Sequence, residues 1–184
     1  MSRIPVKQSK AYPWYLRLMY WRQRRRYGET LIPTQVWGRQ PVLLRRFLAL
    51  FRAFERKNSP LPAQLRALIT VRVSCVNHCA FCLDFNSMRV LREGGEAKLE
   101  ALNDFANSRQ FSEKEKAALA YADAITHTDR EPDDALFERI RTHFNDDAIV
   151  ELTGLIAFQN MSSKFNSALD LPAQGLCKLP EKGD

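Results

Sequence analysis

The sequence predicts an all-α protein of about seven or eight helices. Apolar residues recur at three- and four-residue spacing through most of the chain, which is the period of an amphipathic helix. No segment shows the two-residue alternation of a half-buried strand, and the sequence contains no repeat and no glycine-rich phosphate loop. The 184 residues, 45% of them hydrophobic and 10% aromatic, suffice for one globular domain with an appended arm.

Three helices are predicted in the first 75 residues. The segment 12–28 opens near Pro13 and ends at Gly28, a residue that favours helix termination. The segment 41–57 begins with a proline, which the first helical turn tolerates, and continues with leucines and phenylalanines at three- and four-residue spacing. The segment 62–75 is mostly apolar, so we expect a central, buried helix there.

Four more helices are predicted in the remainder. The segment 79–92 has apolar residues at helical spacing and is followed by a pair of glycines that end it. Ser112 and Glu115 form the capping-box signature that opens the helix 112–127. The remaining periodic segments are 132–144 and 146–169.

Composition divides the chain into three parts. Residues 1–40 form a basic, aromatic-rich N-terminal arm, residues 41–171 a helical domain, and residues 172–184 a tail that we expect to be loose because it holds two prolines and two glycines. Residues 1–60 carry 14 Lys and Arg against 2 Glu, a balance of +12, whereas the other residues carry 14 basic against 19 acidic side chains, a balance of −5. A basic segment therefore precedes a mildly acidic body.

The N-terminal arm is too apolar to be a free tail, so we expect it to pack partly on the body. Its aromatic residues include Trp14, Tyr15, Tyr20 and Trp21. Its cations gather at Arg22, Arg24, Arg25 and Arg26. Such a cluster can attract a membrane surface, nucleic acid or an acidic partner, but it contains no motif that reads bases. We favour packing between subunits or a solvated face over membrane or nucleic-acid binding.

The expected compartment is the cytoplasm. No run approaches the roughly 18 apolar residues of a membrane span, and basic residues interrupt every apolar run before residue 40, unlike a secretory signal. The four cysteines are few, and three of them are clustered rather than spread as a disulfide framework would be. In a reducing compartment this clustering favours redox or metal chemistry.

The cluster is Cys75, Cys79 and Cys82, spaced C-x3-C-x2-C. This spacing can hold an iron–sulfur cluster, but the known enzymes that use it place the loop after a strand of a βα barrel, and no strands are predicted here. Zinc needs four ligands, and His78, the only nearby candidate for the fourth, lies inside a tight turn between the cysteines. We therefore expect neither a metal nor a cofactor.

A redox pair is the simplest chemistry for Cys79 and Cys82. Two cysteines three residues apart at the start of a helix lie on one face, close enough to form a disulfide. The unpaired N–H groups and partial positive charge of a helix N-terminus stabilise a thiolate, the form that attacks a peroxide or a disulfide. The alternative is that cysteines serve as small buried hydrophobes; we favour that role for Cys75 and expect Cys177 to be incidental.

The segment "LRALITVRVSCVNHCAFCLDFNS" resembles the core signature of the carboxymuconolactone decarboxylase family, in particular its alkyl hydroperoxidase D-like branch. The segments "EKAALAYADAIT" and "IVELTGLIAFQNMSSKFNSALDL" are similar to later helices of that family. The second contains its Asn-x-x-x-(Lys/Arg)-Phe-Asn ending at Asn160, Lys164, Phe165 and Asn166. The resemblance covers roughly residues 41–171 and leaves the basic arm as an extension.

The resemblance implies an all-helical fold that assembles as trimers or hexamers. It also implies that Cys82 becomes the sulfenic acid and that Cys79 supplies a proton and resolves it. Two relay residues of the family are replaced: Ala67 stands in the position of a glutamate and Asn86 in that of a histidine. Neutral Asn cannot take a proton near pH 7, although it can hydrogen-bond a thiolate or a water. His78 or Asp84 are the stand-in bases that the sequence offers.

The predicted function is a thiol-dependent peroxidase or disulfide reductase of the peroxiredoxin type. Cys82 would attack a hydroperoxide or another small-molecule substrate, Cys79 would close the disulfide, and an external dithiol would reduce it. We expect a homo-oligomer. Two alternatives stay open: a non-catalytic or redox-sensing member whose pair oxidises without turnover, and a lactone decarboxylase or isomerase.

Overall fold

The computed structural model describes residues 2–178, and helices account for all the regular structure in that range. Two short 3-10 turns, Ser9–Ala11 and Leu102–Asp104, accompany the α-helices. The α-helices are α1 Trp14–Tyr27, α2 Ile32–Trp37, α3 Pro41–Phe54, α4 Ala63–Val76, α5 Ala80–Arg92, α6 Glu96–Glu100, α7 Glu113–Thr126, α8 Asp134–Arg141 and α9 Asp146–Ala168.

The all-α prediction is confirmed, but the helix count differs. We predicted about seven or eight helices, and the described residues form nine. The two additional helices, α2 and α6, have six and five residues, too few turns to show a helical period in the sequence. None of the helices in the described part of the chain is long and apolar enough to span a membrane.

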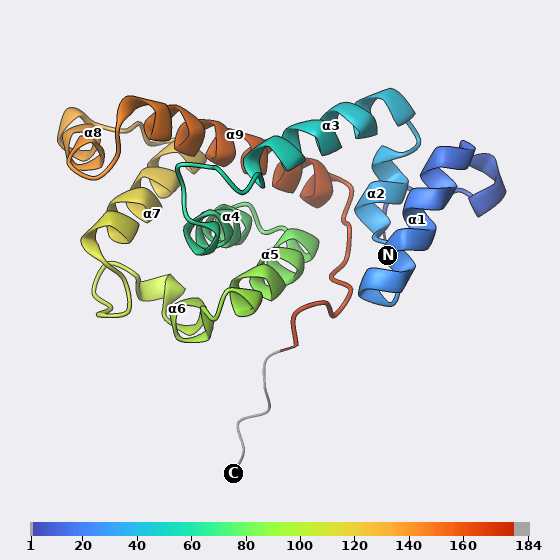
Figure 1. The fold of residues 1–184 in the computed structure, drawn as a ribbon, viewed down its shortest axis with the longest axis horizontal. Coiled ribbons are helices and arrows are strands. Elements are labelled where there is room, and N and C mark those ends of the chain that lie inside the picture. The colour runs from blue at the N-terminus through green and yellow to red at the C-terminus, as the bar shows by residue number, and fades with distance from the viewer. Residues whose placement is uncertain (1, 179–184) are drawn as a thin grey trace, which may run out of the picture.

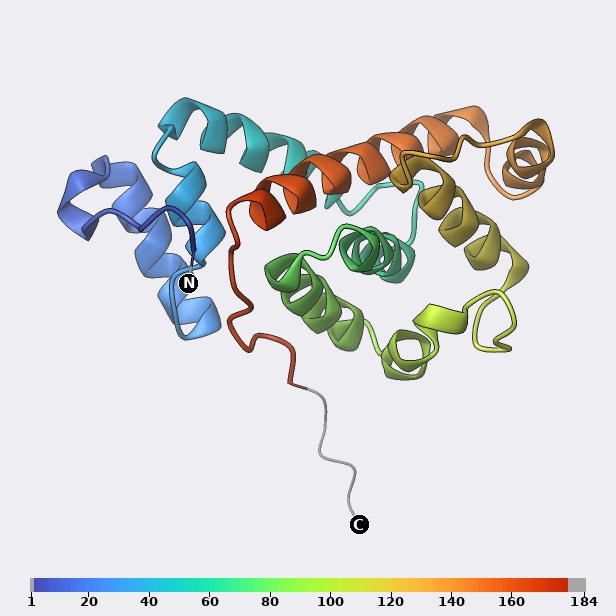
Figure 2. The ribbon, with the colours of Figure 1, turned by 180° about the vertical axis from the view of Figure 1, so that it is seen from behind.

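Helix α4 is the centre of the body. Figures 1 and 2 show it end-on, with α5, α7 and α9 around it. Leu65, Leu68, Ile69, Val71 and Val73 of α4 are all almost completely buried, because its neighbours cover it on every side. The mostly apolar sequence of this segment is the signature of such a helix. Truncating one of these side chains to alanine would cost about 2–5 kcal/mol of stability.

The N-terminal arm is a small helical layer beside α3 and the end of α9 (Figure 1). Tyr20 is buried, and its hydroxyl donates to the carbonyl of Thr34 at 3.1 Å, which ties α1 to α2. The ring of Trp37 stacks on that of Phe165 with centroids 3.8 Å apart, which joins the arm to α9. Gly38 is required here, since a Cβ at this position would lie 2.1 Å from the Tyr20 hydroxyl.

The aromatic residues of the arm are not all used for this packing. Trp14 is 73% exposed and Trp21 is 50% exposed, whereas Tyr20 is 2% exposed. An apolar composition alone does not say which rings face the core, because that depends on how α1 rotates against α2 and α3. The arm therefore packs on the body through one face and leaves a second aromatic face open.

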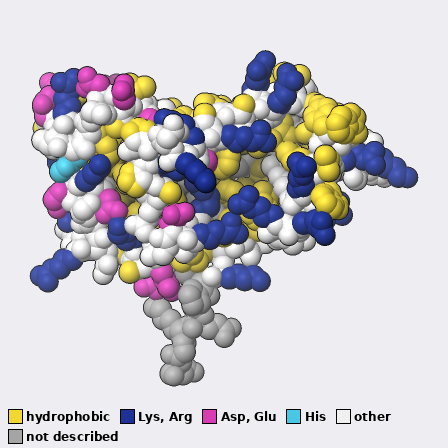
Figure 3. All heavy atoms as spheres, in the orientation of Figure 1, with side chains coloured by type: hydrophobic (Ala, Val, Ile, Leu, Met, Phe, Trp, Pro, Cys, Tyr) yellow, Lys and Arg dark blue, Asp and Glu magenta, His cyan; other side chains and the backbone are white. Residues whose placement is uncertain are grey.

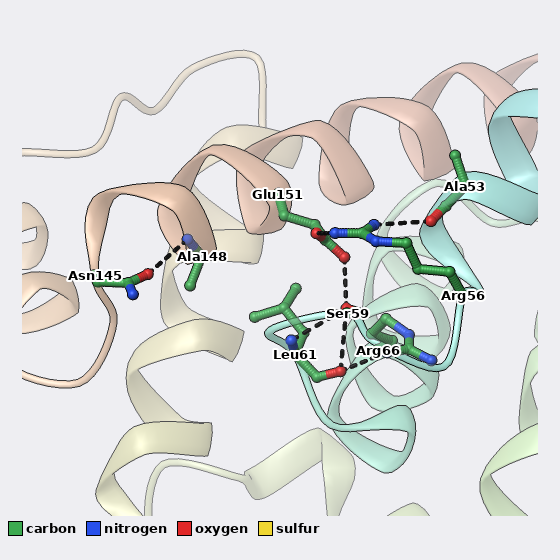
Figure 4. Close-up of polar contacts among 8 residues, drawn as sticks. All are labelled: Ala53, Arg56, Ser59, Leu61, Arg66, Asn145, Ala148 and Glu151. Carbon is green, nitrogen blue, oxygen red and sulfur yellow. Dashed lines mark hydrogen bonds and ion pairs between the residues drawn. The ribbon is translucent and has the colours of Figure 1, made fainter.

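The segment that joins α3 to α4 is fastened to α9 by Glu151 (Figure 4). Arg56 forms an ion pair with this carboxylate, and the Ser59 hydroxyl donates to it at 2.5 Å. At the start of α4 the Arg66 guanidinium donates to the carbonyl of Leu61. These contacts fix the entry into α4 and hence the position of the residues at its other end.

The segment 172–178 contains no helix and runs between the body and the arm (Figures 1 and 2). It belongs to the tail that we expected to be loose. Gln174 hydrogen-bonds the arm twice: its Oε1 accepts the Ile32 N–H at 2.8 Å and its Nε2 donates to the Thr30 carbonyl at 3.2 Å. Residues 179–184 of the predicted tail lie outside the described range.

Candidate active site

A tight turn carries the chain from α4 into α5 and places Cys79 at the helix start. His78 has φ +50°, the left-handed conformation that commonly follows a helix end. The N–H of Cys79 donates to the carbonyl of Ser74 at 3.0 Å, and the N–H of His78 donates to that of Cys75 at 3.1 Å. This pair of hydrogen bonds is a Schellman motif. It ends α4 and makes the next residue, Cys79, the N-cap of α5.

Cys79 accepts a backbone hydrogen bond as a helix cap does. The N–H of Cys82 donates to its Sγ at 3.2 Å, so the two cysteines adjoin as predicted for a pair at a helix N-terminus. A hydrogen bond from the Cys82 side chain, aided by this N–H, lowers the pKa of Cys79 although the thiol is 2% exposed. Cys79 is therefore the cysteine that favours the thiolate form.

Cys82 lies three residues further along the chain, in the first turn of α5. It is 4% exposed, and Nδ2 of Asn166 donates to its Sγ at 3.1 Å. The hydrogen bond that it gives to Cys79, together with burial, raises the pKa of Cys82, while hydrogen bonds from Asn166 and Ser162 work in the opposite direction. Within the pair, Cys79 is therefore the thiol that loses a proton more readily, and Cys82 is the thiol that retains one.

A cavity of about 380 Å³ opens over Cys82 and not over Cys79. Helices α1 and α2 of the arm form one wall, and α3, α5 and α9 form the others. Its walls include the aromatic rings of Tyr27, Trp37, Phe47, Phe51, Phe81 and Phe85. The polar side chains nearest Cys82 are buried, namely Asn86, Gln159, Ser162 and Asn166. A molecule in this cavity would meet the sulfur of Cys82.

Asn86 belongs to a buried polar network rather than standing alone. Its Nδ2 donates to the Ser74 hydroxyl at 3.4 Å, and Gln159 Nε2 donates to the same oxygen at 3.0 Å. Its Oδ1 accepts from Arg89, which in turn forms an ion pair with Glu55 at 2.5 Å. The amide is held in place by partners on both sides. At the other replaced relay position, Ala67 is buried in the core.

Neither of the two stand-in bases lines the cavity over Cys82. His78 is exposed and does not line the cavity. The carboxylate of Asp84 points to the tail: it accepts the backbone N–H groups of Gln174 and Cys177, each at 2.7 Å. The structure thus places Cys79, Cys82 and Asn86 together, but it gives Asp84 the role of fastening residues 174–177.

The other two cysteines are outside the site. Cys75 packs against the apolar cluster of α4, α5 and α7, and burial raises its pKa. Burial, together with the charge of Asp84, also raises the pKa of Cys177. Within residues 2–178 no three side chains of His, Cys, Asp or Glu gather closely enough to hold a metal ion.

Our sequence analysis missed the contribution of α9 to the site. It noted Asn166 as part of a family-like ending but gave no role to Gln159, Ser162 or Asn166. These polar residues recur at three- and four-residue spacing along α9, and all three are buried. Because buried polar groups need partners, such a stripe indicates a polar site facing it. The spacing was visible, but only the packing of α9 on α5 shows that Cys82 is what it faces.

The fold and the site define a class: an all-α protein with a C-x-x-C pair at a helix N-terminus beneath a cavity. Residues 41–124 match the model of the carboxymuconolactone decarboxylase family. The chain is 45% identical over 183 residues to the uncharacterized protein YnjA of Escherichia coli (strain K12), which covers 99% of this chain and 96% of that protein. The chain belongs to the carboxymuconolactone decarboxylase family.

A second relative is more distant. The uncharacterized protein YdfG of Bacillus subtilis (strain 168) is 32% identical over 116 residues, which cover 61% of this chain and 78% of that protein. The match to YnjA, by contrast, includes nearly all of the basic arm, so the arm is shared with at least one relative.

Solved structures with the same fold are peroxidase-related proteins and a debrominase. The alkylhydroperoxidase AhpD core protein from Ralstonia eutropha JMP134, an uncharacterized peroxidase-related protein, superposes with a TM-score of 0.83 at 21% identity, covering 94% of this chain and 92% of that chain. The debrominase Bmp8 superposes with a TM-score of 0.80 at 23% identity, covering 94% and 91%. At such identities the likeness concerns the fold.

Proposed function

We propose that this protein is a thiol-dependent peroxidase of the alkyl hydroperoxidase D-like kind, which reduces hydroperoxides with Cys79 and Cys82. The observation that carries the proposal is the division of labour within the pair. Cys82 borders the cavity, where a substrate can reach it, and Cys79 caps the helix, where a thiolate is favoured. The peroxidase-related proteins that share the fold support the same assignment.

The first step needs a base, and Cys79 can serve as one. When Cys82 Sγ attacks the terminal oxygen of the hydroperoxide, its proton passes to the Cys79 thiolate. The O–O bond breaks, and the departing alkoxide takes that proton from Cys79 to become an alcohol. Asn166, which donates to Cys82 Sγ at 3.1 Å, stabilises the negative charge that develops on this sulfur. No glutamate or histidine relay is required for this transfer.

The second step closes the disulfide. The Cys79 thiolate attacks the sulfur of the Cys82 sulfenic acid and expels hydroxide, which solvent protonates to water. The balance is one hydroperoxide and two thiols consumed, and one alcohol, one water and one disulfide formed. An external dithiol then reduces the disulfide by exchange through a mixed disulfide. A cytoplasmic location, where dithiol carriers are reduced, belongs to this proposal.

Two further parts of the expected function belong to this proposal. We place the chain in a homo-oligomer, a trimer or hexamer, and the exposed apolar side chains of α1 and α3, among them Trp14, Val42 and Leu43, support this. The basic arm belongs to the enzyme rather than to nucleic-acid or membrane binding, because it forms a wall of the cavity. A light-scattering measurement of molar mass tests the oligomer directly.

The experiment that tests the peroxidase is hydroperoxide consumption in the presence of a dithiol reductant. Cys82→Ser should abolish turnover. Cys79→Ser removes both the proposed base and the resolving thiol, so Cys82 should oxidise slowly, stop after one equivalent and leave a sulfenic acid that dimedone labels. Cys75→Ser, a cysteine outside the pair, should leave the rate within about twofold of wild type, as expected for a site that touches no reacting group.

Each alternative predicts a different result. A rate unchanged by Cys82→Ser and by Cys79→Ser would exclude the thiol mechanism. A disulfide that forms stoichiometrically without catalytic consumption of peroxide would identify a redox-sensing protein. A lactone decarboxylase or isomerase would act on its substrate equally well with both cysteines replaced.

A further inference from the structure

The basic arm contributes arginines to the cavity over Cys82. Arg22 and Arg26 of α1 and Arg52 of α3 border it together with the aromatic walls. Arg22 and Arg26 are four residues apart and therefore lie on the same side of α1. In Figure 3, dark blue Lys and Arg side chains gather around the apolar surface between the body and the arm. The cavity thus combines an apolar interior with a cationic rim.

These three arginines lack partners of opposite charge. No Asp or Glu borders the cavity, and within residues 2–178 no carboxylate lies at ion-pair distance from Arg22, Arg26 or Arg52. Two partly buried arginines of the body, by contrast, have carboxylate partners: Arg72 pairs with Asp123 at 2.6 Å and Arg89 with Glu55 at 2.5 Å. The lining of the cavity offers its three arginines no such partner.

Such an arrangement is unfavourable without an anion. Like charges four residues apart on a helix repel each other by a few tenths of a kcal/mol. The helix macrodipole explains cations in the last turn of α1 and of α3, but it does not explain why every acidic side chain is missing around the cavity. An anionic group of a bound molecule would satisfy all three arginines, whose planar guanidinium groups suit a carboxylate.

The interior of the cavity determines which kind of body the bound molecule has beyond its anionic group. The aromatic rings of the cavity walls pack well against a flat, apolar part of a ligand, by stacking or by edge-on contact. The volume of about 380 Å³ is within the usual range for small-molecule pockets, roughly 300–1,000 Å³. An apolar cavity of about 150 Å³ already admits benzene, so this one has room for a ring with a short side chain.

We propose that the basic arm is a substrate-recognition element: Arg22, Arg26 and Arg52 bind the carboxylate of an apolar organic acid whose body lies between the aromatic walls. The reactive end of that molecule then points to Cys82. This inference rests on the proposed peroxidase for the reaction, which makes the substrate a carboxylate-bearing hydroperoxide. The binding of the organic acid itself does not depend on turnover.

The binding test uses unreactive probes. Calorimetric titration of the reduced full-length protein compares phenylpropionate with the neutral phenylpropionamide, and a fatty acid with its neutral amide. We expect the carboxylate to bind at least about tenfold more tightly than its amide, the size of one charge-assisted hydrogen bond. Arg22→Gln, Arg26→Gln and Arg52→Gln should each reduce that preference several-fold. All three side chains are exposed, so these variants should fold.

The matched control is Arg24→Gln. Arg24 is exposed and lies in the same turn of α1, but it does not border the cavity. It should leave the preference for carboxylate unchanged. An equal loss in Arg24→Gln and Arg22→Gln would overturn the proposal, since it would indicate general attraction by the basic arm. Equal affinity for acid and amide would overturn it as well. Tighter binding of phenylpropionate than of the fatty acid supports an aryl body, and the reverse supports a chain.

Turnover separates this inference from the proposed function. The value of kcat/KM for cumene hydroperoxide is compared with that for its ring-carboxylated derivative in wild type and in the arginine variants. A preference for the carboxylated substrate that Arg22→Gln removes supports the inference. Equal turnover of both substrates in every variant overturns it and leaves the peroxidase intact. Carboxylate binding without any turnover supports the anion site and excludes the peroxidase.

Discussion

Asn166 donates a hydrogen bond from Nδ2 to Sγ of Cys82 at 3.1 Å, although the two residues are 84 positions apart in the chain. The amide is buried, and its Oδ1 has no hydrogen-bond partner within the described residues. The side-chain amide is therefore oriented so that Nδ2 donates to the sulfur, while Oδ1 is left without a donor. This relationship makes α9 part of the chemistry of a pair that α5 carries.

Asn166→Ala should slow the reaction of Cys82 with hydroperoxide roughly tenfold to a hundredfold, the equivalent of about 1.5–3 kcal/mol for a hydrogen bond to a charged group. Asn166→Asp should be slower still, because a carboxylate beside Cys82 opposes ionisation of its thiol. Stopped-flow measurement of the oxidation of the reduced Cys79–Cys82 pair by hydroperoxide, with Cys79 intact, checks both. Lys164→Ala, an exposed change on the same helix, should have no effect.

Removing one cysteine of the pair should shift the pKa of the other, and the two shifts should have opposite directions. Hydrogen bonding from Cys82 lowers the pKa of Cys79 below the ordinary value of about 8.5 for a free cysteine, so the thiolate persists below that pH and is lost as the pH falls through the lowered pKa. Cys82→Ala removes the largest cause, so the pKa of Cys79 should rise. Cys79→Ala should lower the pKa of Cys82, whose hydrogen bond to Cys79 raises it.

The ultraviolet absorbance of the thiolate as a function of pH measures both shifts. The double variant Cys79→Ala, Cys82→Ala gives the background from Cys75 and Cys177, whose pKa values burial raises. If Cys82→Ala left the titration of Cys79 unmoved, the pair would not share its proton, and Cys79 could not act as the base proposed for the first step.

His78→Gly should stabilise the protein. His78 has φ +50°, a conformation that costs a residue with a Cβ roughly 1–2 kcal/mol and glycine almost nothing. The melting temperature should therefore rise, while His78→Ala should leave it about unchanged because alanine carries the same penalty. Peroxide turnover decides the second question about this residue: loss of activity in both variants would make the exposed imidazole the base, whereas activity retained in both excludes that role.

Asp84→Ala should release residues 174–177 from α5. Two backbone N–H groups would lose a charged acceptor, which costs about 1.5–3 kcal/mol for each hydrogen bond at most. Hydrogen exchange at Gln174 and Cys177 should accelerate, and so should exchange at Ile32, whose N–H donates to the Gln174 side chain. A Cys82 that loses its reactivity while hydrogen exchange in the tail stays slow would instead assign Asp84 to catalysis.

Much of the fold could be predicted because it depends on local periodicity. The apolar segment 62–75 became the central helix α4, and the Ser112 and Glu115 signature forms the capping box that begins α7. The helices α2 and α6 could not be predicted, because five or six residues contain too little of a helical period. Helix α2 depends on the neighbours that bury Pro33, Thr34 and Val36, among them Tyr20, whose hydroxyl donates to the Thr34 carbonyl.

The sequence by itself determined the pair. Its spacing and its position after a break between helices were enough to place Cys79 and Cys82 at the start of a helix, since both features depend on residues next to each other in the chain. Only the tertiary structure decided which cysteine faces the cavity, that Asn166 donates to it, and that Asp84 holds the tail. Those contacts join residues about 80–90 positions apart. The arginines of the arm gain a role for the same reason, because the packing of α1 and α2 against the body creates the cavity they border.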